Sequence, residues 1–268
     1  GYRNSAIAAE RLVRGAPGCC LSVLGWQHHI VYRGQVDFVD SLRANRNVGL
    51  RHFPGQGGTL YQRLQGDPAM EKVFHDSMSC ISSQANREFA EAIPLESSRH
   101  LADLGGGDGS NAIELARRFK DLRVTVFDSA PVAGIAQRKI AAAGLADRIG
   151  TASGNFLSDP LPPGVDAILL AHIVPIWSAQ RNTELFKRCF AHLPSGGRLF
   201  VFSTMSWDDE TGPLVNALGS PYFQAVATGE GMLYTQGDIR GWLQAAGFAS
   251  LSNIPLPMEH QLITADKE

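Results

Sequence analysis

Two kinds of signal are missing from this chain of 268 residues. Its four cysteines show neither a C-x-x-C pair nor a spacing typical of metal ligands, which argues against a zinc module or a disulfide framework. No apolar run approaches the ~20 residues that a membrane span needs, and no signal peptide is visible. We therefore expect reduced, mostly buried thiols in a cytoplasmic protein with no membrane partner.

Neither sign of charge dominates. The chain has 24 basic and 26 acidic residues, a formal net charge of −2, and they are spread without long runs. A nucleic acid partner is disfavoured, because such proteins carry a basic patch or stripe. With 44% hydrophobic and 19% charged residues, the composition is that of an ordinary globular protein of one or two domains. The chain opens with Gly1 rather than Met, and we expect natural N-terminal residues to be missing.

The most informative stretch is HLADLGGGDGSN at residues 100–111. A short apolar run reaches Asp103, three consecutive glycines follow, and apolar positions at helical spacing come next, which predicts a strand, a tight turn and a helix. Gly105, Gly107 and Gly109 alternate, unlike the G-x-G-x-x-G of a dinucleotide fingerprint. Glycines here permit positive φ and let a ligand approach the backbone, while the helix amides point toward it.

The next two predicted strands also end in residues suited to a ligand. The second strand ends at Asp128, twenty-five residues after Asp103. A carboxylate at this tip can accept two ribose hydroxyls. After a third short strand, Asn155 and Phe156 place an amide and an aromatic face where an adenine would lie. These tips predict one nucleoside-binding edge, although a glycine turn and a strand-ending Asp also occur in other doubly wound domains.

Residues 1–96 carry apolar positions at helical spacing, broken by clusters of Gly and Pro, and therefore predict a set of helices. Within the last of them, Phe74 and Met78 lie one turn apart, where they either line a substrate pocket or belong to the core. Arg51 flanks a glycine-rich loop at residues 49–58. Its guanidinium suits a substrate carboxylate, although most surface arginines are simply solvated.

After Pro94 the chain alternates between strand and helix patterns, which predicts an α/β fold with a parallel sheet and right-handed crossovers. The link at residues 257–259 is too short for a crossover, so the last strand must run antiparallel. The predicted strands are 100–104, 123–127, 148–152, 166–171, 198–203, 248–255 and 260–266. The predicted helices between them lie near 110–119, 131–143, 180–192 and 236–246.

Four motifs in this second part of the chain carry a resemblance to a known family. They are DLGGGDG at 103–109, VFDS at 126–129, GNF at 154–156 and LPSGGRL at 193–199. In this order they resemble class I S-adenosylmethionine (SAM) methyltransferases, specifically the caffeate-type and bacterial natural-product O-methyltransferase family. The family usually has Asp where this chain has Asn155, which can still accept a hydrogen bond from an adenine amine.

The resemblance implies a Rossmann-like sheet of seven strands, the last one antiparallel, preceded by a helical region. Residues 1–96 would cover the substrate and take part in a homodimer, and residues 97–268 would form the SAM-binding domain. The implied function is SAM-dependent methyl transfer to a small molecule in secondary metabolism, with oxygen as the expected acceptor atom. The residues implied to bind SAM are Asp103, Gly105, Gly107, Asp128, Ser129, Asn155, Phe156 and Trp177.

The chain departs from the family after the fourth predicted strand. The family has a motif resembling His-x-x-His-Asp-Trp there, whose second His is the general base. This chain reads HIVPIW at residues 172–177, so His172 and Trp177 match while Pro175 occupies the base position. Proline cannot accept a proton, and histidine-assisted O-methylation is therefore the uncertain part of the expectation.

Several routes remain open without that base. His172 ends a strand at the ligand edge and His260 lies at the turn joining the last two strands, so both are candidate bases. Together they lack a third metal ligand, and we expect no metal. The substrate could instead be already acidic, or its nucleophile could be a carbon or nitrogen atom. The chain could also bind SAM without methylating anything.

Overall fold

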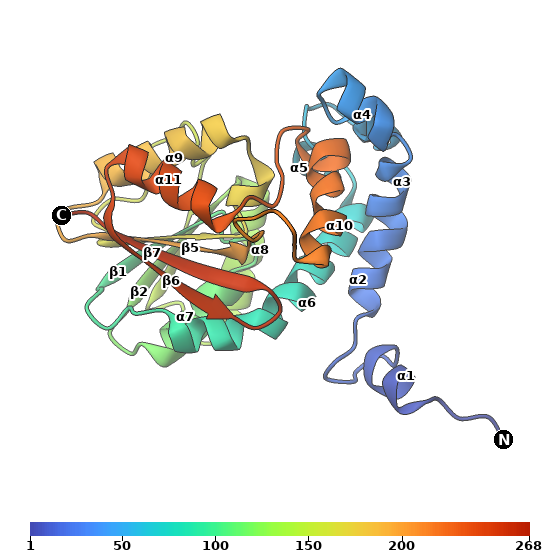
Figure 1. Ribbon diagram of the computed structural model, residues 1–268. Coiled ribbons are helices and arrows are strands. Elements are labelled where there is room, and N and C mark those ends of the chain that lie inside the picture. Colours follow the sequence, from blue (N-terminus) through green and yellow to red (C-terminus); the bar gives the residue numbers. More distant parts are fainter.

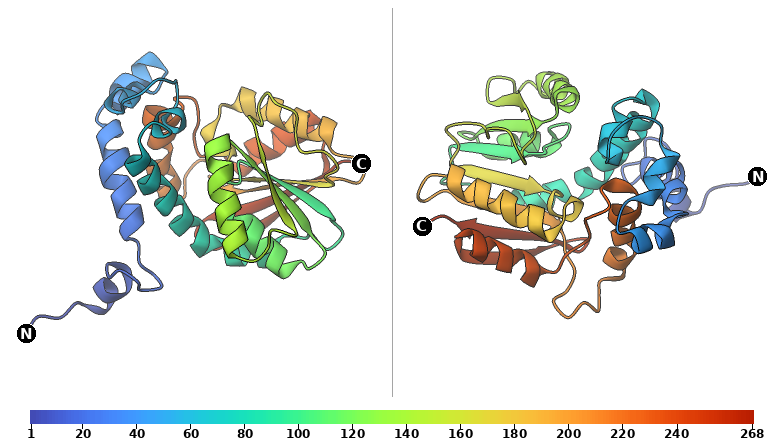
Figure 2. Two further views of the ribbon diagram at one scale, coloured as in Figure 1. Left: turned by 180° about the vertical axis from the view of Figure 1, so that it is seen from behind. Right: turned by 90° about the horizontal axis from the view of Figure 1, so that it is seen from above.

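The computed structural model describes the backbone of residues 1–268 and every side chain except those of residues 82–84. A seven-stranded sheet flanked by helices lies beside a group of helices, and α6 (Pro68–Ala92) extends from that group toward the sheet (Figures 1 and 2). The strand order is β3-β2-β1-β4-β5-β7-β6, and β7 runs antiparallel to both neighbours. The Rossmann-like methyltransferase sheet predicted from the sequence is confirmed.

The observed strands differ from the predicted ranges by at most one residue at either end. They are β1 (His100–Leu104), β2 (Arg123–Asp128), β3 (Ile149–Ser153), β4 (Ala167–Ala171), β5 (Arg198–Thr204), β6 (Ala249–Leu256) and β7 (His260–Asp266). The central strands β1, β4 and β5 are buried almost throughout, because helices cover both faces of this part of the sheet.

Helices cover the two faces unequally. The face formed by Leu104, Leu170 and Val201 packs against α9 (Ala179–His192) and α11 (Gln236–Ala246). The opposite face is covered by α6 together with two further helices. These are α7 (Ser110–Arg118) and α8 (Ala130–Ala142). The carboxyl ends of β1, β2, β4 and β5 consequently meet at one edge of the sheet, which the helical group approaches (Figure 2).

The helices before the sheet are short except for α6. They are α1 (Ala6–Arg11), α2 (Leu21–Trp26), η1 (Gln27–Val31), α3 (Tyr32–Gln35), α4 (Phe38–Ala44), η2 (Val48–His52) and α5 (Leu60–Leu64). The long helix begins where sequence chemistry dictates, since Asp67 accepts a hydrogen bond from the Met70 amide at 3.1 Å and Pro68 occupies the first helical position. Within the described residues, no helix has both the length and the apolar character needed to cross a bilayer.

A segment from the second half of the chain completes this helical group. The sequence reading missed α10 (Leu214–Tyr222) and the adjoining η4 (Phe223–Ala227), which lie between β5 and α11. Tyr222 and Val226 are buried in a cluster with Ile30 and Leu50. The packing is close, since a Cβ added at Gly34 would lie 2.4 Å from Val226 Cγ2.

Candidate functional site

The glycine loop joins β1 to α7 at the carboxyl edge of the sheet. Gly105, Gly107 and Gly109 all have the left-handed backbone expected of the turn, with φ of 70°, 58° and 79°. A Cβ at Gly105 would lie 2.3 Å from Ile173 Cδ1, whereas a Cβ at Gly107 would meet no atom of the described side chains or backbone within 4 Å. The loop is therefore packed on its inner side and open at Gly107, where a ligand can approach.

Asp103 lies beneath this loop, and its side chain is completely buried. Neither carboxylate oxygen has a hydrogen-bond partner among the described residues. Burial, followed by the nearby charges of Asp128 and Asp108, raises the pKa of Asp103 to about 7. Buried carboxylates without partners are costly, so this group suits a ligand that brings hydrogen-bond donors or positive charge.

Asp128 connects the end of β2 to the glycine loop. Its Oδ2 accepts a hydrogen bond from the Gly107 amide at 3.0 Å, and its Oδ1 accepts one from the Ser129 amide at 2.7 Å. Burial raises the pKa of Asp128, although these amides oppose the shift. Each oxygen keeps a second lone pair, so the carboxylate fits two ribose hydroxyls. Ser129 contributes its backbone and begins α8 as the N-cap residue.

The turn after β3 holds its side chains in different ways. The Asn155 side-chain oxygen accepts a hydrogen bond from the Leu157 backbone amide at 3.0 Å. The Asn155 backbone amide donates to the Asp159 carboxylate at 2.8 Å. The side-chain oxygen predicted to face adenine thus accepts one hydrogen bond from the local turn and keeps a second lone pair for an adenine amine. Phe156 lies nearer the glycine loop, where a Cβ at Gly105 would be 3.3 Å from its ring.

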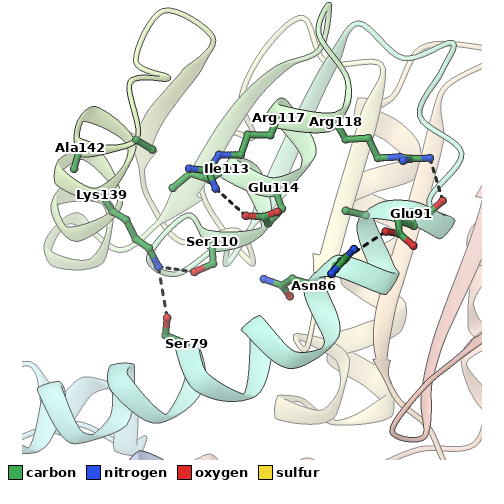
Figure 3. Close-up of a pocket in the computed structure, with 13 residues that line it drawn as sticks. Ser79, Asn86, Glu91, Ser110, Ile113, Glu114, Arg117, Arg118, Lys139 and Ala142 are labelled. Atoms are coloured by element: carbon green, nitrogen blue, oxygen red, sulfur yellow. Dashed lines mark hydrogen bonds and ion pairs between the residues drawn. The ribbon is translucent and has the colours of Figure 1, made fainter. Parts of the chain in front are cut away.

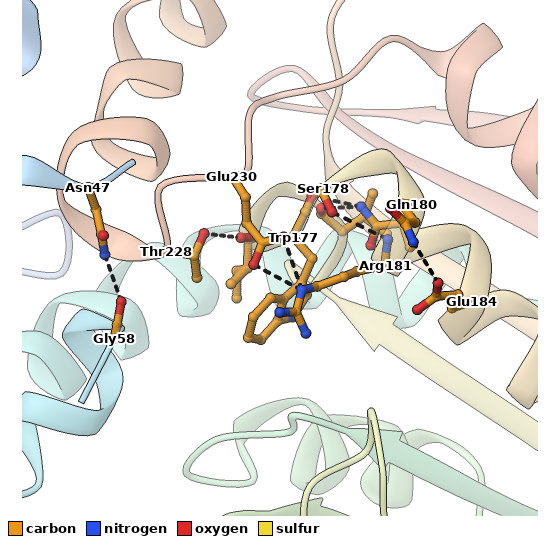
Figure 4. Close-up of polar contacts among 12 residues, drawn as sticks. Asn47, Gly58, Trp177, Ser178, Gln180, Arg181, Glu184, Thr228 and Glu230 are labelled. Carbon is orange, nitrogen blue, oxygen red and sulfur yellow. Dashed lines mark hydrogen bonds and ion pairs between the residues drawn. The ribbon is translucent and has the colours of Figure 1, made fainter. Parts of the chain in front are cut away.

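Trp177 follows η3 (Val174–Ile176), and its indole projects between the helical group and the strands (Figure 4). The Arg181 guanidinium lies 5.4 Å from the ring centroid, and Arg181 Nε is 3.0 Å from the Glu230 carboxylate. Trp177 Nε1 is enclosed without a partner among the described residues. The ring is therefore held on one side by a cation and can offer its other side to a planar ligand.

The strand order brings His172 and His260 together at this edge, with ring centroids 5.2 Å apart. Phe202 stacks on His260 at 5.1 Å, and His260 Nδ1 donates to the Met258 carbonyl at 2.9 Å. Neither Nε2 has a partner among the described residues.

Burial, reinforced by the neighbouring His260, lowers the pKa of His172 to about 3, and burial also lowers the pKa of His260. Both rings are neutral at pH 7, and His172 is a weak proton acceptor there. Within the described part of the chain, no three His, Cys, Asp or Glu side chains form a potential metal site.

The three predicted substrate residues lie in the helical part. Arg51 Nη2 is 2.5 Å from Oδ1 of the buried Asp37, whose other oxygen lies 2.7 Å from His52 Nε2. Asp37 was not singled out from the sequence, because an isolated Asp in a helical pattern gives no sign of its partners. Phe74 is partly buried and meets Tyr61 edge to face at 5.7 Å, while Met78 is partly buried one turn further along α6.

Residues 36–249 match the family model described as an O-methyltransferase domain. The chain is 40% identical over 247 residues to the L-tyrosine C(3)-methyltransferase of Streptomyces lavendulae, which covers 92% of this chain and 68% of that protein. It is 30% identical over 253 residues to the 3-hydroxy-5-methyl-1-naphthoate 3-O-methyltransferase of Streptomyces sahachiroi, covering 94% of this chain and 71% of the relative.

Two solved structures share the fold and part of the sequence. One is the SAM-dependent methyltransferase SibL in its apo form, with a TM-score of 0.78 and 34% identity, covering 92% of this chain and 73% of that one. The other is human N-acetylserotonin methyltransferase in complex with SAM, with a TM-score of 0.89 and 25% identity, covering 99% of this chain and 75% of that one.

Proposed function

The chain belongs to the O-methyltransferase domain family and is a SAM-dependent methyltransferase, and from this premise we propose that it methylates a small phenol-type molecule at a ring carbon next to the hydroxyl. The observation that carries the proposal is the 40% identity to the tyrosine C(3)-methyltransferase over 92% of this chain. The buried Pro175 in η3 supports it, because no proton acceptor occupies the position of the family's base.

Methylation at a ring carbon depends less on a general base than methylation at a hydroxyl oxygen does. The electron-rich carbon forms its new bond first, and the ring proton then leaves from a strongly acidic intermediate. Water or a weak acceptor suffices for that step, whereas a neutral hydroxyl oxygen gains more from losing its proton during attack. A buried proline at position 175 is thus compatible with the carbon route.

When bound, SAM supplies an electrophilic methyl group on a sulfonium sulfur. We assign Asp128 to the ribose hydroxyls, the backbone of the loop at Gly105 and Gly107 to close contact with the cofactor, and Phe156 and Trp177 to the adenine. Asp103 lies under the loop and adds negative charge when ionised, which suits a positively charged ligand. Holding cofactor and acceptor in line can account for about 7–11 kcal/mol of barrier reduction.

The helical residues 1–96, together with α10 and η4, would cover the acceptor. Phe74 packs against the apolar cluster of the helical group, and Met78 lies one turn further along α6, the helix that extends toward the sheet; we place both at the acceptor. Arg51 is paired with Asp37 yet its side chain is 60% exposed, so it remains a candidate for a substrate carboxylate. A homodimer and a cytoplasmic location complete the proposal.

Methylation at oxygen is the second candidate. It is favoured by the family description and by the naphthoate 3-O-methyltransferase at 30% identity. A phenol acidified by other ring substituents would be partly ionised at neutral pH, which removes the need for the missing base. His172 and His260 stay candidate proton acceptors in this route.

The test uses ring-deuterated tyrosine and other ring-deuterated phenols beside keto acids and amines, with S-adenosylhomocysteine release and product mass as readouts. Carbon methylation replaces one ring deuterium, whereas oxygen methylation retains them all. We expect a product that has gained a methyl group and lost one deuterium. A product retaining every deuterium would select the oxygen route, and SAM binding with no S-adenosylhomocysteine across the panel would overturn both.

A further inference from the structure

Lys139 joins three elements around the cofactor loop. From α8 its Nζ lies 2.5 Å from Asp108 Oδ2. It also lies 2.6 Å from Ser110 Oγ at the start of α7 and 3.5 Å from Ser79 Oγ on α6 (Figure 3). It reaches the loop from a groove of about 920 Å³ between α6, α7 and α8. One ammonium group therefore contacts the glycine loop and the helices on either side of it.

The loop needs this support because its last glycine cannot cap the following helix. Gly109 is the N-cap of α7, with φ of 79° and no side chain to accept a hydrogen bond. Asp108 replaces the missing cap, since its Oδ1 accepts from the Ser110 amide at 3.0 Å and from Ser110 Oγ at 2.6 Å. The other carboxylate oxygen of Asp108 is the one that accepts from Lys139 Nζ.

The charges around the glycine loop also indicate a supporting role for Lys139. Asp103, Asp108 and Asp128 surround the loop, and the bridge from Lys139 to Asp108 is the only ion pair they form among the described side chains. Burial opposes ionisation of Asp108, yet its contacts with Lys139 and Ser110 lower its pKa overall. Without the ammonium group, none of the three carboxylates beside the loop would have an ion-pair partner among the described side chains.

We propose that Lys139 is a positioning residue for the cofactor, which keeps the glycine loop in its binding conformation through Asp108. The proposal rests on the assignment of this loop to SAM under the proposed function. The Lys139 side chain is 40% exposed and that of Asp108 only 19%, so the bridge is more sheltered than an ordinary surface pair. A surface ion pair alone would contribute almost nothing to cofactor affinity.

The test measures SAM affinity by titration calorimetry for Lys139→Met, Lys139→Arg and Asp108→Asn. We expect Lys139→Met to raise the dissociation constant roughly five- to tenfold, less than the loss of a charged hydrogen bond to the ligand itself, because Lys139 acts through Asp108. The KM for SAM should rise while kcat at saturating SAM stays within twofold, and Lys139→Arg should restore most of the affinity. The double variant that combines Lys139→Met with Asp108→Asn should bind SAM almost as tightly as either single variant, because both substitutions remove the same contact.

The matched control is Lys72→Met, which removes an exposed pair with Asp76 at 2.8 Å. Hydrogen exchange of the amides at residues 105–112 should quicken in cofactor-free Lys139→Met and stay unchanged in the control. Unchanged SAM affinity in Lys139→Met beside weakened binding in Asp128→Ala would overturn the role of Lys139 alone. Unchanged affinity in Asp128→Ala as well would instead remove the loop from the cofactor site.

Discussion

At the residue scale, Asp128 is suited to bind the cofactor because each of its carboxylate oxygens keeps a free lone pair. Each oxygen accepts one backbone amide, from Gly107 or Ser129, and keeps capacity for one ribose hydroxyl. Replacing it with Ala should raise the SAM dissociation constant tenfold or more, because hydrogen bonds to a charged group contribute about 1.5–3 kcal/mol. Calorimetry checks this, with the exposed Asp76→Ala as the control. Equal affinities in wild type and Asp128→Ala would remove this carboxylate from the site.

His172 makes the protein sensitive to acid. The pKa of His172 is about 3 in the folded chain against 6.5 in the unfolded one, so the unfolded state binds more protons between these values. The free energy of unfolding should therefore fall as the pH drops from about 6.5 toward 3. Urea titrations across this range should show a shallower pH slope in His172→Ala.

The same variant separates the two roles considered for His172. If the ring takes part in proton transfer, His172→Ala lowers turnover while SAM affinity stays near the wild-type value. Turnover equal to that of wild type would make the ring structural, as its contacts with Phe202 and His260 permit.

At the scale of elements, the helical group depends on close packing between α3 and η4. A Cβ at Gly34 would lie 2.4 Å from Val226 Cγ2, so Gly34→Ala should destabilise the fold by about 1–3 kcal/mol through overpacking. Adding Val226→Ala should recover part of that loss by making room for the new methyl group. Thermal unfolding of the single and double variants measures the effect. Additive losses would show that the two positions do not share this contact.

At the scale of the whole molecule, one loop connects the helical group to the turn after β4. Thr228 Oγ1 donates to the Ile176 carbonyl at 2.5 Å, and a Cβ at Gly231 would lie 2.1 Å from the Pro175 carbonyl oxygen. Gly231→Ala must therefore shift the turn that carries Trp177. We expect turnover to fall about tenfold or more, since small displacements of positioning groups are costly in catalysis.

Gly241→Ala is the matched control, because a Cβ there meets none of the described atoms within 4 Å and the residue lies inside α11. It should keep wild-type turnover, with unchanged or slightly increased stability from the better helix former. Steady-state kinetics on both variants tests the connection. Wild-type turnover in Gly231→Ala would show that the loop does not position the turn.

The sequence by itself determined the sheet and the chain positions of the glycine loop, Asp103 and Asp128. Strands at the carboxyl edge are short, apolar and bounded by turn residues, and Gly105 and Gly107 must lie where φ is positive, so local patterns carry this information. It did not predict α10 and η4. Pro221 lies inside that helix, and its apolar residues gain stability only against Ile30 and Leu50 from the other end of the chain.

Only the tertiary structure decided which charges and rings meet. Arg51 pairs with Asp37, Lys139 reaches Asp108, and the rings of His172 and His260 meet edge to face. These contacts join residues far apart in the sequence, and a lysine or arginine in a helical pattern has the same local signal whether it is solvated or paired. Burial also sets the low pKa of His172, since desolvation depends on what packs around the ring and not on its neighbours in the chain.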